Sequence, residues 1–200
     1  MSRFEEHKHS ILAEEERDIY IGVINRFIGY YSREAQKETQ NDTTREYPFV
    51  AMDTRQVFEQ IHIVHEQLGK DTPPGKNHTF LDVGCGIGNI MLIAEQYSFD
   101  AYGIEKDEYP YQLATRLIDE EHVWQKDIWE FDGYHTFDVI YYFRPLPDAG
   151  PQTKFELMIE EKIKKSGILI ANRKISSAIE EDSRFKRLSL DHPIWQKVSE

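Results

Sequence analysis

Three alternating glycines lie between an apolar run and a helical pattern, and at this junction the chain could do chemistry. The glycines are Gly84, Gly86 and Gly88, and Asp82 lies two residues before the first of them. The apolar run predicts a strand, and the spacing of the apolar residues after the glycines predicts a helix. A helix that begins this way leaves backbone N–H groups unpaired at its positive end, where glycine lets a ligand approach closely.

Two further strand-like segments end in an acidic residue. The segment 100–105 ends at Glu105, and the segment 122–127 ends at Asp127. A carboxylate is a natural acceptor for two vicinal hydroxyl groups, as in the sites that bind the ribose of a dinucleotide. Carboxylates at strand ends are also often merely solvated, so the argument depends on the three signals occurring in order.

The arrangement D-x-G-x-G-x-G resembles the first motif of the class I S-adenosylmethionine (SAM)-dependent methyltransferases, and the similarity covers roughly residues 78–173. The resemblance implies that the glycine loop passes under the methionine and ribose of SAM and that Glu105 binds the ribose hydroxyls. It also implies that Asp127 accepts from the adenine amino group while Ile128 packs on the ring. The cofactor-binding residues expected on this basis are Asp82, Gly84, Cys85, Gly86, Gly88, Glu105, Lys106, Asp127, Ile128 and Tyr142.

The expected fold is α/β, with the seven-stranded Rossmann-like sheet of these methyltransferases, mostly parallel with an antiparallel last strand, and an N-terminal helical extension. The nine residues 128–136 separate the third strand from the fourth, so the crossover helix between them is expected to be absent or one turn long. The other elements expected are helices at 89–97, 107–120, 152–165 and 175–182, strands at 137–143 and 167–172, and a terminal hairpin from the apolar runs at 185–190 and 194–198.

The extension comprises residues 1–75 and the SAM-binding domain residues 76–200. Apolar spacing predicts amphipathic helices at 10–31 and 54–68, and the polar residues 33–46 read as a mobile connection between them. We interpret the extension as a lid or substrate-selecting cap over the site.

The second of these helices carries two further signals. Asp53 and Gln56 form a capping-box pattern at its start. His62 and His65 are three residues apart, but a metal site would need further ligands that the sequence does not supply. We therefore interpret the histidines as part of a solvated helix face, and we predict no metal site.

Composition favours a cytoplasmic enzyme. The 200 residues are enough for one domain with a sizeable core. Cys85 is the single cysteine, so no intramolecular disulfide forms, and we read it as a small loop residue. The charged N-terminus lacks the apolar region of a secretory signal, and no window approaches a membrane span.

The charge of the chain narrows the class of partner. The formal net charge is −12, and no cluster of lysine and arginine is dense enough to build a phosphate-binding face. A nucleic-acid substrate is therefore disfavoured, and the expected methyl acceptor is a small molecule or a protein. The sequence does not indicate an oligomeric state.

The predicted function is methyl transfer from SAM, with no identified catalytic residue. Tyr142, Asp148 and His135 are candidates for a general base by position alone. The segment 142–145, Tyr-Phe-Arg-Pro, differs from the Asn/Asp-Pro-Pro-aromatic motif of adenine-N6 and glutamine-amide methyltransferases, so those substrates are disfavoured. Two alternatives stay open: a non-catalytic SAM-binding regulatory protein, and an NAD-linked oxidoreductase. The glycine spacing and Asp82 count against the second.

Overall fold

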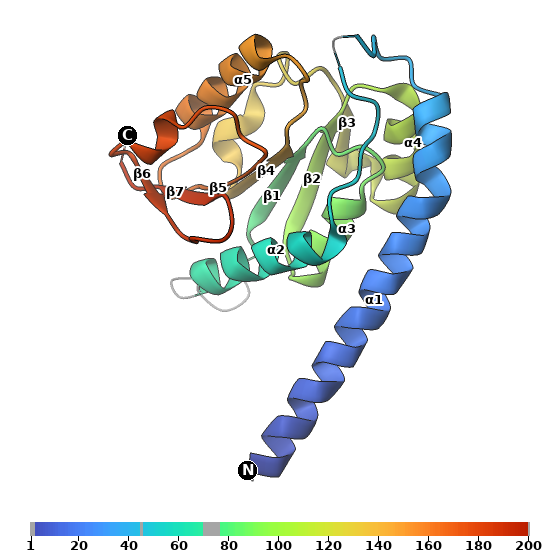
Figure 1. Ribbon diagram of the computed structural model, residues 1–200, viewed down its shortest axis with the longest axis vertical. Coiled ribbons are helices and arrows are strands. Elements are labelled where there is room, and N and C mark those ends of the chain that lie inside the picture. The colour runs from blue at the N-terminus through green and yellow to red at the C-terminus, as the bar shows by residue number, and fades with distance from the viewer. Residues whose placement is uncertain (1–2, 45, 70–76, 200) are drawn as a thin grey trace.

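The computed structural model describes residues 3–44, 46–69 and 77–199. Figure 1 shows a twisted sheet with helices packed against it and one long helix that projects beyond it. The α-helices are α1 (Arg3–Lys37), α2 (Thr54–Gly69), α3 (Asn89–Gln96), α4 (Glu108–Leu117) and α5 (Ala149–Lys162). The strands are β1 (Thr79–Val83), β2 (Asp100–Glu105), β3 (Val123–Gln125), β4 (Val139–Phe143), β5 (Ile168–Asn172), β6 (Phe185–Arg187) and β7 (Ile194–Lys197). Short 3₁₀ turns are η1 (Glu120–His122), η2 (Gly133–Thr136) and η3 (Ala178–Glu180).

The sheet has seven strands in the order β3-β2-β1-β4-β5-β7-β6. Strands β1 to β5 are parallel, whereas β7 runs antiparallel to both β5 and β6. This is the predicted fold, including the terminal hairpin. The connection from β3 to β4 contains only η2 as regular structure, as the short spacing predicted. The strand order reverses between β1 and β4, and ligands of open α/β sheets bind at the carboxyl ends of strands at such a point.

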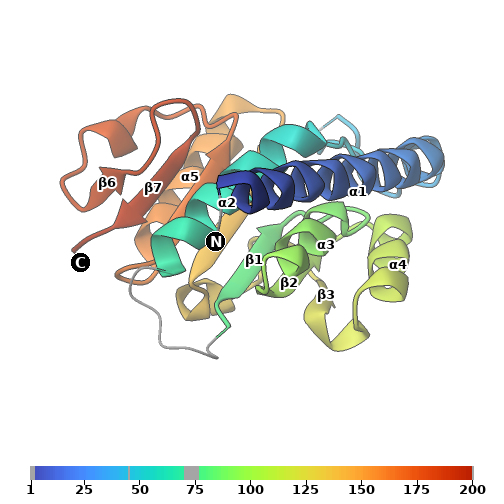
Figure 2. The ribbon, with the colours of Figure 1, turned by 90° about the horizontal axis from the view of Figure 1, so that it is seen from below.

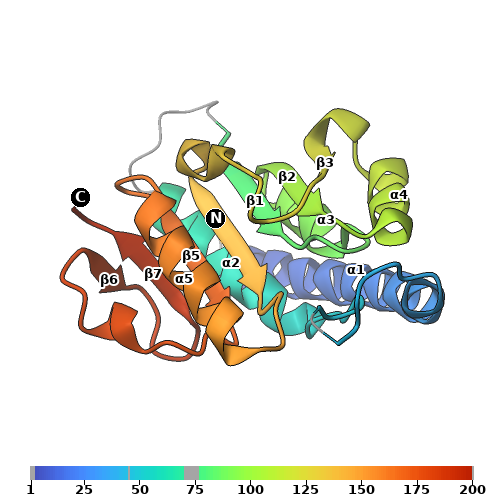
Figure 3. The ribbon, with the colours of Figure 1, turned by 90° about the horizontal axis from the view of Figure 1, so that it is seen from above.

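Helices cover both faces of the sheet. On one face α2, α3 and the middle of α1 bury apolar side chains against the strands, and on the other face α5 does so. Figure 2 shows α1 crossing α2 and passing beside α3, and Tyr20 of α1 donates a hydrogen bond to the carbonyl of Leu92 in α3. Seen from above in Figure 3, the C-terminal end of α1 lies beside α4. There Tyr109 donates to Glu34 at 2.9 Å.

Helix α1 is longer than the predicted 10–31 and includes the start of the segment expected to be a polar connection. Ala35 is fully buried with Ile87 and Leu113, so contact with α4 extends the helix beyond its amphipathic pattern. Gly22 and Gly29 do not interrupt the helix. They serve no close packing contact either, because a Cβ at either position would meet nothing within 4 Å.

Two other elements differ from expectation. Strand β3 ends at Gln125, so Asp127 lies in the loop two residues beyond it and not at the strand end. The helix predicted at 175–182 is only the turn η3, because the chain is held instead by a buried carboxylate. Glu156 of α5 accepts from the backbone N–H groups of Ile175 and Ser176 at 2.8 Å each.

The N-terminal extension shares one core with the sheet. Ile24 of α1 and Ile61 of α2 belong to the same buried cluster as Phe80 of β1. Asp53 accepts from the Gln56 N–H at 2.9 Å, as the capping pattern predicted. The expected boundary between residues 75 and 76 lies outside the described residues.

Two classes of feature do not occur in the described part of the chain. No helix there is both long and apolar enough to cross a membrane. No group of three His, Cys, Asp or Glu side chains there could hold a metal ion. His62 and His65 pack instead against the ring of Tyr97, with centroid separations of 5.9 and 5.6 Å.

Candidate functional site

A cavity of about 340 Å³ lies at the carboxyl ends of the central strands. It is bounded by the glycine loop after β1, by the residues after β2 to β5, and by the extended segment 46–52 between α1 and α2. Small-molecule sites are concave and usually span about 300–1,000 Å³. No residue of α1 or α2 is among those that line the cavity, so the covering part of the extension is its connecting segment.

The glycine loop needs its glycines for two different reasons. Gly84 and Gly86 line the cavity, with φ angles of +77° and +55° that disfavour other residues. The ring of Phe49 lies directly on Gly86, and a Cβ there would be 2.2 Å from the ring carbon Cδ2. Gly88 faces away from the cavity, and a Cβ at that position would lie 3.3 Å from the Cβ of Ala114. Gly88 therefore allows α3 and α4 to pack closely.

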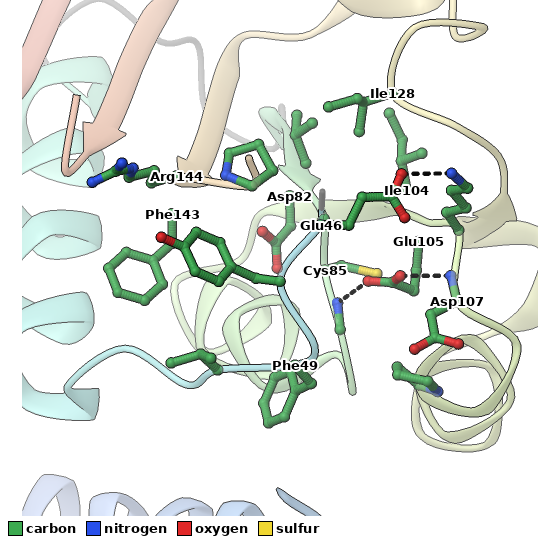
Figure 4. A pocket seen from close by; sticks show the side chains of 18 of the residues that line it. Glu46, Phe49, Asp82, Cys85, Ile104, Glu105, Asp107, Ile128, Phe143 and Arg144 are labelled. Atoms are coloured by element: carbon green, nitrogen blue, oxygen red, sulfur yellow. Dashed lines mark hydrogen bonds and ion pairs between the residues drawn. The ribbon is translucent and has the colours of Figure 1, made fainter. Parts of the chain in front are cut away.

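The carboxylate of Glu105 is fixed by two backbone donors at the end of β2. Gly86 N–H donates to its Oε2 and Asp107 N–H donates to its Oε1, both at 2.8 Å (Figure 4). Burial raises the pKa of Glu105 to about 7 against the lowering effect of these hydrogen bonds. The glycine loop therefore orients the carboxylate at the end of β2, and the two predicted motifs form one site.

Asp82 presents an unsatisfied oxygen to the same cavity. Its side chain is 2% exposed, and its Oδ2 has no hydrogen-bond partner among the described residues. Burial, and then the negative charge of Glu105, raises the pKa of Asp82 well above its usual range. A buried polar atom without a partner is costly, so its position beside a cavity indicates that a ligand satisfies it.

Cys85 lies in the loop between these carboxyls. Burial, and then the charges of Asp82 and Glu105, raises the pKa of its thiol well above the usual value. The thiol is therefore protonated, and it packs as a small apolar side chain against Gly103 of β2. This agrees with its interpretation as a loop residue.

Asp127, the residue expected to contact adenine, forms an ion pair with Lys106. Lys106 lies 2.6 Å from Glu46 and 3.2 Å from Asp127, measured between the Nζ atom and the nearest carboxylate oxygens. The other oxygen of Asp127 accepts from the Trp129 N–H at 3.0 Å. Ile128 lines the cavity beside them. The bridge ties the covering segment to the loop after β3.

The covering segment is tied to the site at further points. Gln36 donates to the carbonyl of Phe49 at 3.2 Å, and the Gln40 N–H donates to Asp107 at 3.0 Å. At its far end, the Tyr141 hydroxyl lies 3.0 Å from the sulfur of Met52. Hydrogen bonds to α1 and β4 therefore hold the segment beside the cavity, and the bond from Gln40 to Asp107 holds the chain that leads into it.

The three candidate bases lie away from the cavity. The side chain of Tyr142 points to the opposite face of the sheet and packs on Phe155 of α5, and its hydroxyl is buried. Its neighbour Tyr141 lines the cavity instead. His135 is exposed in η2, at the amino end of β4, and Asp148 is exposed before α5.

Several cavity residues were not predicted from the sequence. Segment 46–52 has no motif, and its position depends on contacts with residues far along the chain. Arg173 follows the end of β5 and Arg144 the end of β4, so the strand-end rule that identified Glu105 also identifies these positions once the strands are known.

No family model and no curated protein sequence matches the chain, but solved structures do. An RNA methyltransferase from Salinibacter ruber in complex with S-adenosyl-L-homocysteine (SAH) is 15% identical, with a TM-score of 0.52 over 76% of this chain and 95% of that one. The plantazolicin methyltransferase BpumL, with a desmethylPZN analog and SAH, is 22% identical, with a TM-score of 0.47 over 59% of this chain and 46% of that one. The sugar N-methyltransferase KedS8 from Streptoalloteichus sp. is 19% identical, with a TM-score of 0.44 over 66% and 58%.

The chain spans about half the length of the last two proteins. The likeness to the Salinibacter enzyme, together with the strand order, shows that this chain has the Rossmann-like fold of class I methyltransferases. The fold that the glycine motif predicted is confirmed.

Proposed function

We propose that this protein binds SAM in the cavity and transfers its methyl group to a small-molecule or protein acceptor. The observation that carries the proposal is the pair of carboxyls at the ends of β1 and β2, of which Asp82 is buried and Glu105 partly buried. Glu105 is oriented by the glycine loop, and Asp82 has an oxygen with no partner in the described residues. Both lie at strand ends in a fold that this chain shares with a methyltransferase of known structure.

The cavity residues fit this cofactor group by group. The ribose carries vicinal hydroxyls, and Glu105 offers acceptor oxygens at the end of β2. The methionine part carries an ammonium group, and the unsatisfied oxygen of Asp82 is an acceptor for it. Gly84 has no Cβ and leaves room for the ligand beside the loop, whereas the absence of a Cβ at Gly86 lets the ring of Phe49 lie on the loop. Ile128 lines the cavity and offers an apolar surface for the adenine ring.

Bound SAM supplies an already activated methyl group, so the protein contributes mainly alignment and the exclusion of water. Segment 46–52 covers the glycine loop through Phe49 and is the part of the extension suited to act as a lid. No general base is assigned, because Tyr142, His135 and Asp148 do not line the cavity. An acceptor that arrives with a free lone pair needs no base.

Calorimetric titration with SAM and SAH, with NAD as the control ligand, tests the proposal. We expect micromolar binding of both sulfur ligands and no binding of NAD. Asp82→Asn preserves the shape of the side chain and should weaken SAH binding about tenfold. Asp132→Asn, at a side chain 97% exposed near the amino end of β4, is the matched control and should change nothing.

The outcomes separate the alternatives. Binding of NAD in place of SAM would favour the oxidoreductase reading and refute the proposal. SAM binding without label transfer from methyl-tritiated SAM to any protein or metabolite of a lysate would favour a regulatory SAM-binding protein. Label transfer would identify the acceptor class directly.

A further inference from the structure

Two arginines lie side by side at the carboxyl ends of neighbouring strands and line the cavity. Arg144 follows Phe143 of β4, and Arg173 follows Asn172 of β5. Phe143 and Asn172 are register partners, and the Arg144 N–H donates to the carbonyl of Asn172 at 3.2 Å. Both arginines have positive φ angles, +31° and +54°. Such backbone conformations are uncommon outside glycine and concentrate at functional sites.

Neither arginine is neutralised within the described residues. Arg144 donates to the carbonyl of Pro147 at 2.8 Å, and its Nε is buried without a hydrogen-bond partner. The guanidinium of Arg173 lies over the ring of Phe143, 5.4 Å from its centroid. The next residue along the chain behaves differently, because Lys174 pairs with the buried carboxylates of Glu156 and Glu160 at 3.2 and 2.7 Å.

This contrast is informative in a chain with 36 acidic and 24 basic residues. Acidic side chains are abundant enough to neutralise a structural arginine, and they do so at Arg184 and Arg187. Two guanidinium groups that have no acidic partner in the described part of the chain and lie beside one cavity therefore indicate a ligand anion. The planar guanidinium matches carboxylate and phosphate groups through paired N–H donors.

The charges of the cavity are separated along the sheet. Asp82 and Glu105 lie at the carboxyl ends of β1 and β2, and Asp127 follows β3, where Lys106 is paired with it. Both arginines follow β4 and β5. In Figure 4, Arg144 and Phe143 lie on the opposite side of Asp82 from Glu105. If SAM lies over the acidic half, as the proposed function requires, the arginine half faces the methyl acceptor.

We propose that the methyl acceptor is a small molecule with an anionic group, a carboxylate or a phosphate, which Arg144 and Arg173 bind. This inference rests on the proposed function, because only a methyltransferase has a methyl acceptor. The anion site itself does not depend on that function. The rings of Phe143 and Tyr47, which also line the cavity, would contact the uncharged body of the molecule.

Calorimetry with the SAH-saturated protein tests the anion site. The probes are benzoate and phenyl phosphate, each compared with a neutral counterpart, benzyl alcohol and phenol. We expect the anions to bind at least tenfold more tightly than the neutral compounds. The anion that binds more tightly shows whether the site prefers a carboxylate or a phosphate. Arg144→Gln and Arg173→Gln should each weaken anion binding about tenfold and leave SAH affinity within twofold. Arg116→Gln, exposed on α4, is the control.

Three outcomes would overturn the inference. The first is equal binding of the anions and their neutral counterparts, and the second is no binding of either anion at millimolar concentration. The third is a tenfold loss of SAH affinity in folded Arg144→Gln or Arg173→Gln, because the arginines would then hold the carboxylate of the cofactor. Failure of the proposed function would give a different result. Wild-type protein would then not bind SAH, while arginine-dependent anion binding to the protein alone would persist.

Discussion

The protonation of Glu105 gives the sharpest test of the cofactor site. Because its pKa is raised to about 7, the carboxyl group is about nine-tenths ionised at pH 8 and about one-tenth ionised at pH 6. Gly86 and Asp107 already donate to it, and only the ionised form keeps both oxygens as acceptors for further donors. We therefore expect SAH affinity to fall about tenfold from pH 8 to pH 6.

The variant Glu105→Gln isolates this effect. A hydrogen bond to a charged group contributes about 1.5–3 kcal/mol, so replacing the carboxylate should weaken SAH binding roughly ten- to a hundredfold at pH 8. The affinity of the variant should also change much less between pH 6 and pH 8 than that of the wild type. Titration calorimetry at several pH values measures both quantities, and Glu120→Gln, exposed at the start of η1, is the control.

The same pKa shift predicts an opposite trend in the stability of the ligand-free protein. Glu105 holds its proton more tightly when folded than when unfolded, so it makes unfolding easier as the pH rises from about 4.5 through 7. The pKa of Asp82, which faces the same carboxyl group, is also raised, so the slope that remains in Glu105→Gln includes the contribution of Asp82. Wild-type SAH affinity that stayed constant from pH 6 to 8, or unweakened binding by the variant, would refute this reasoning.

Three other substitutions probe the site and its support. Phe49→Ala uncovers Gly86 and should speed SAH dissociation about tenfold in stopped-flow measurements, whereas Val50→Ala, at a side chain 52% exposed, should not. Gly103→Ala places a Cβ 2.6 Å from the sulfurs of Cys85 and Met91, so urea unfolding should show a loss of about 1–3 kcal/mol; an unchanged midpoint would contradict this packing. Gln60→Leu leaves the buried amide of Asn172 unpaired and should cost about 1–3 kcal/mol, and the double variant with Asn172→Leu should recover part of it.

The strands and the glycine loop could be predicted because their signals are local. Apolar runs, glycine spacing and strand-end carboxylates all lie within a few residues of one another, and Glu105 was found in this way. Asp127 shows the limit, because β3 is three residues long and the loop after it carries the acid. Pairing with β2 decides where β3 ends, so the number of residues between that end and Asp127 does not follow from the sequence of the segment itself.

The choice between Tyr141 and Tyr142 could not be made from the sequence. Both faces of β4 are buried, so apolar residues occupy successive positions and the usual alternation is lost. Tyr141 faces α2 and the cavity, whereas Tyr142 faces α5, and only the packing of those helices distinguishes them. The covering segment was missed for a similar reason: Phe49 reaches Gly86 through contacts between residues far apart in the chain.

Net charge and local charge lead to different conclusions in this molecule. The overall charge of −12 argued against polyanionic partners, and no arginine pair entered that argument because Arg144 and Arg173 are far apart in the sequence. The parallel pairing of β4 with β5 brings them together, while Asp82, Glu105 and Asp127 lie at or just beyond the carboxyl ends of β1, β2 and β3. An acidic protein can thus keep polyanions away from its surface and still offer a cationic subsite to a small anion. The partner class therefore follows from the charges that strand order places beside the cavity, more than from the sum over the chain.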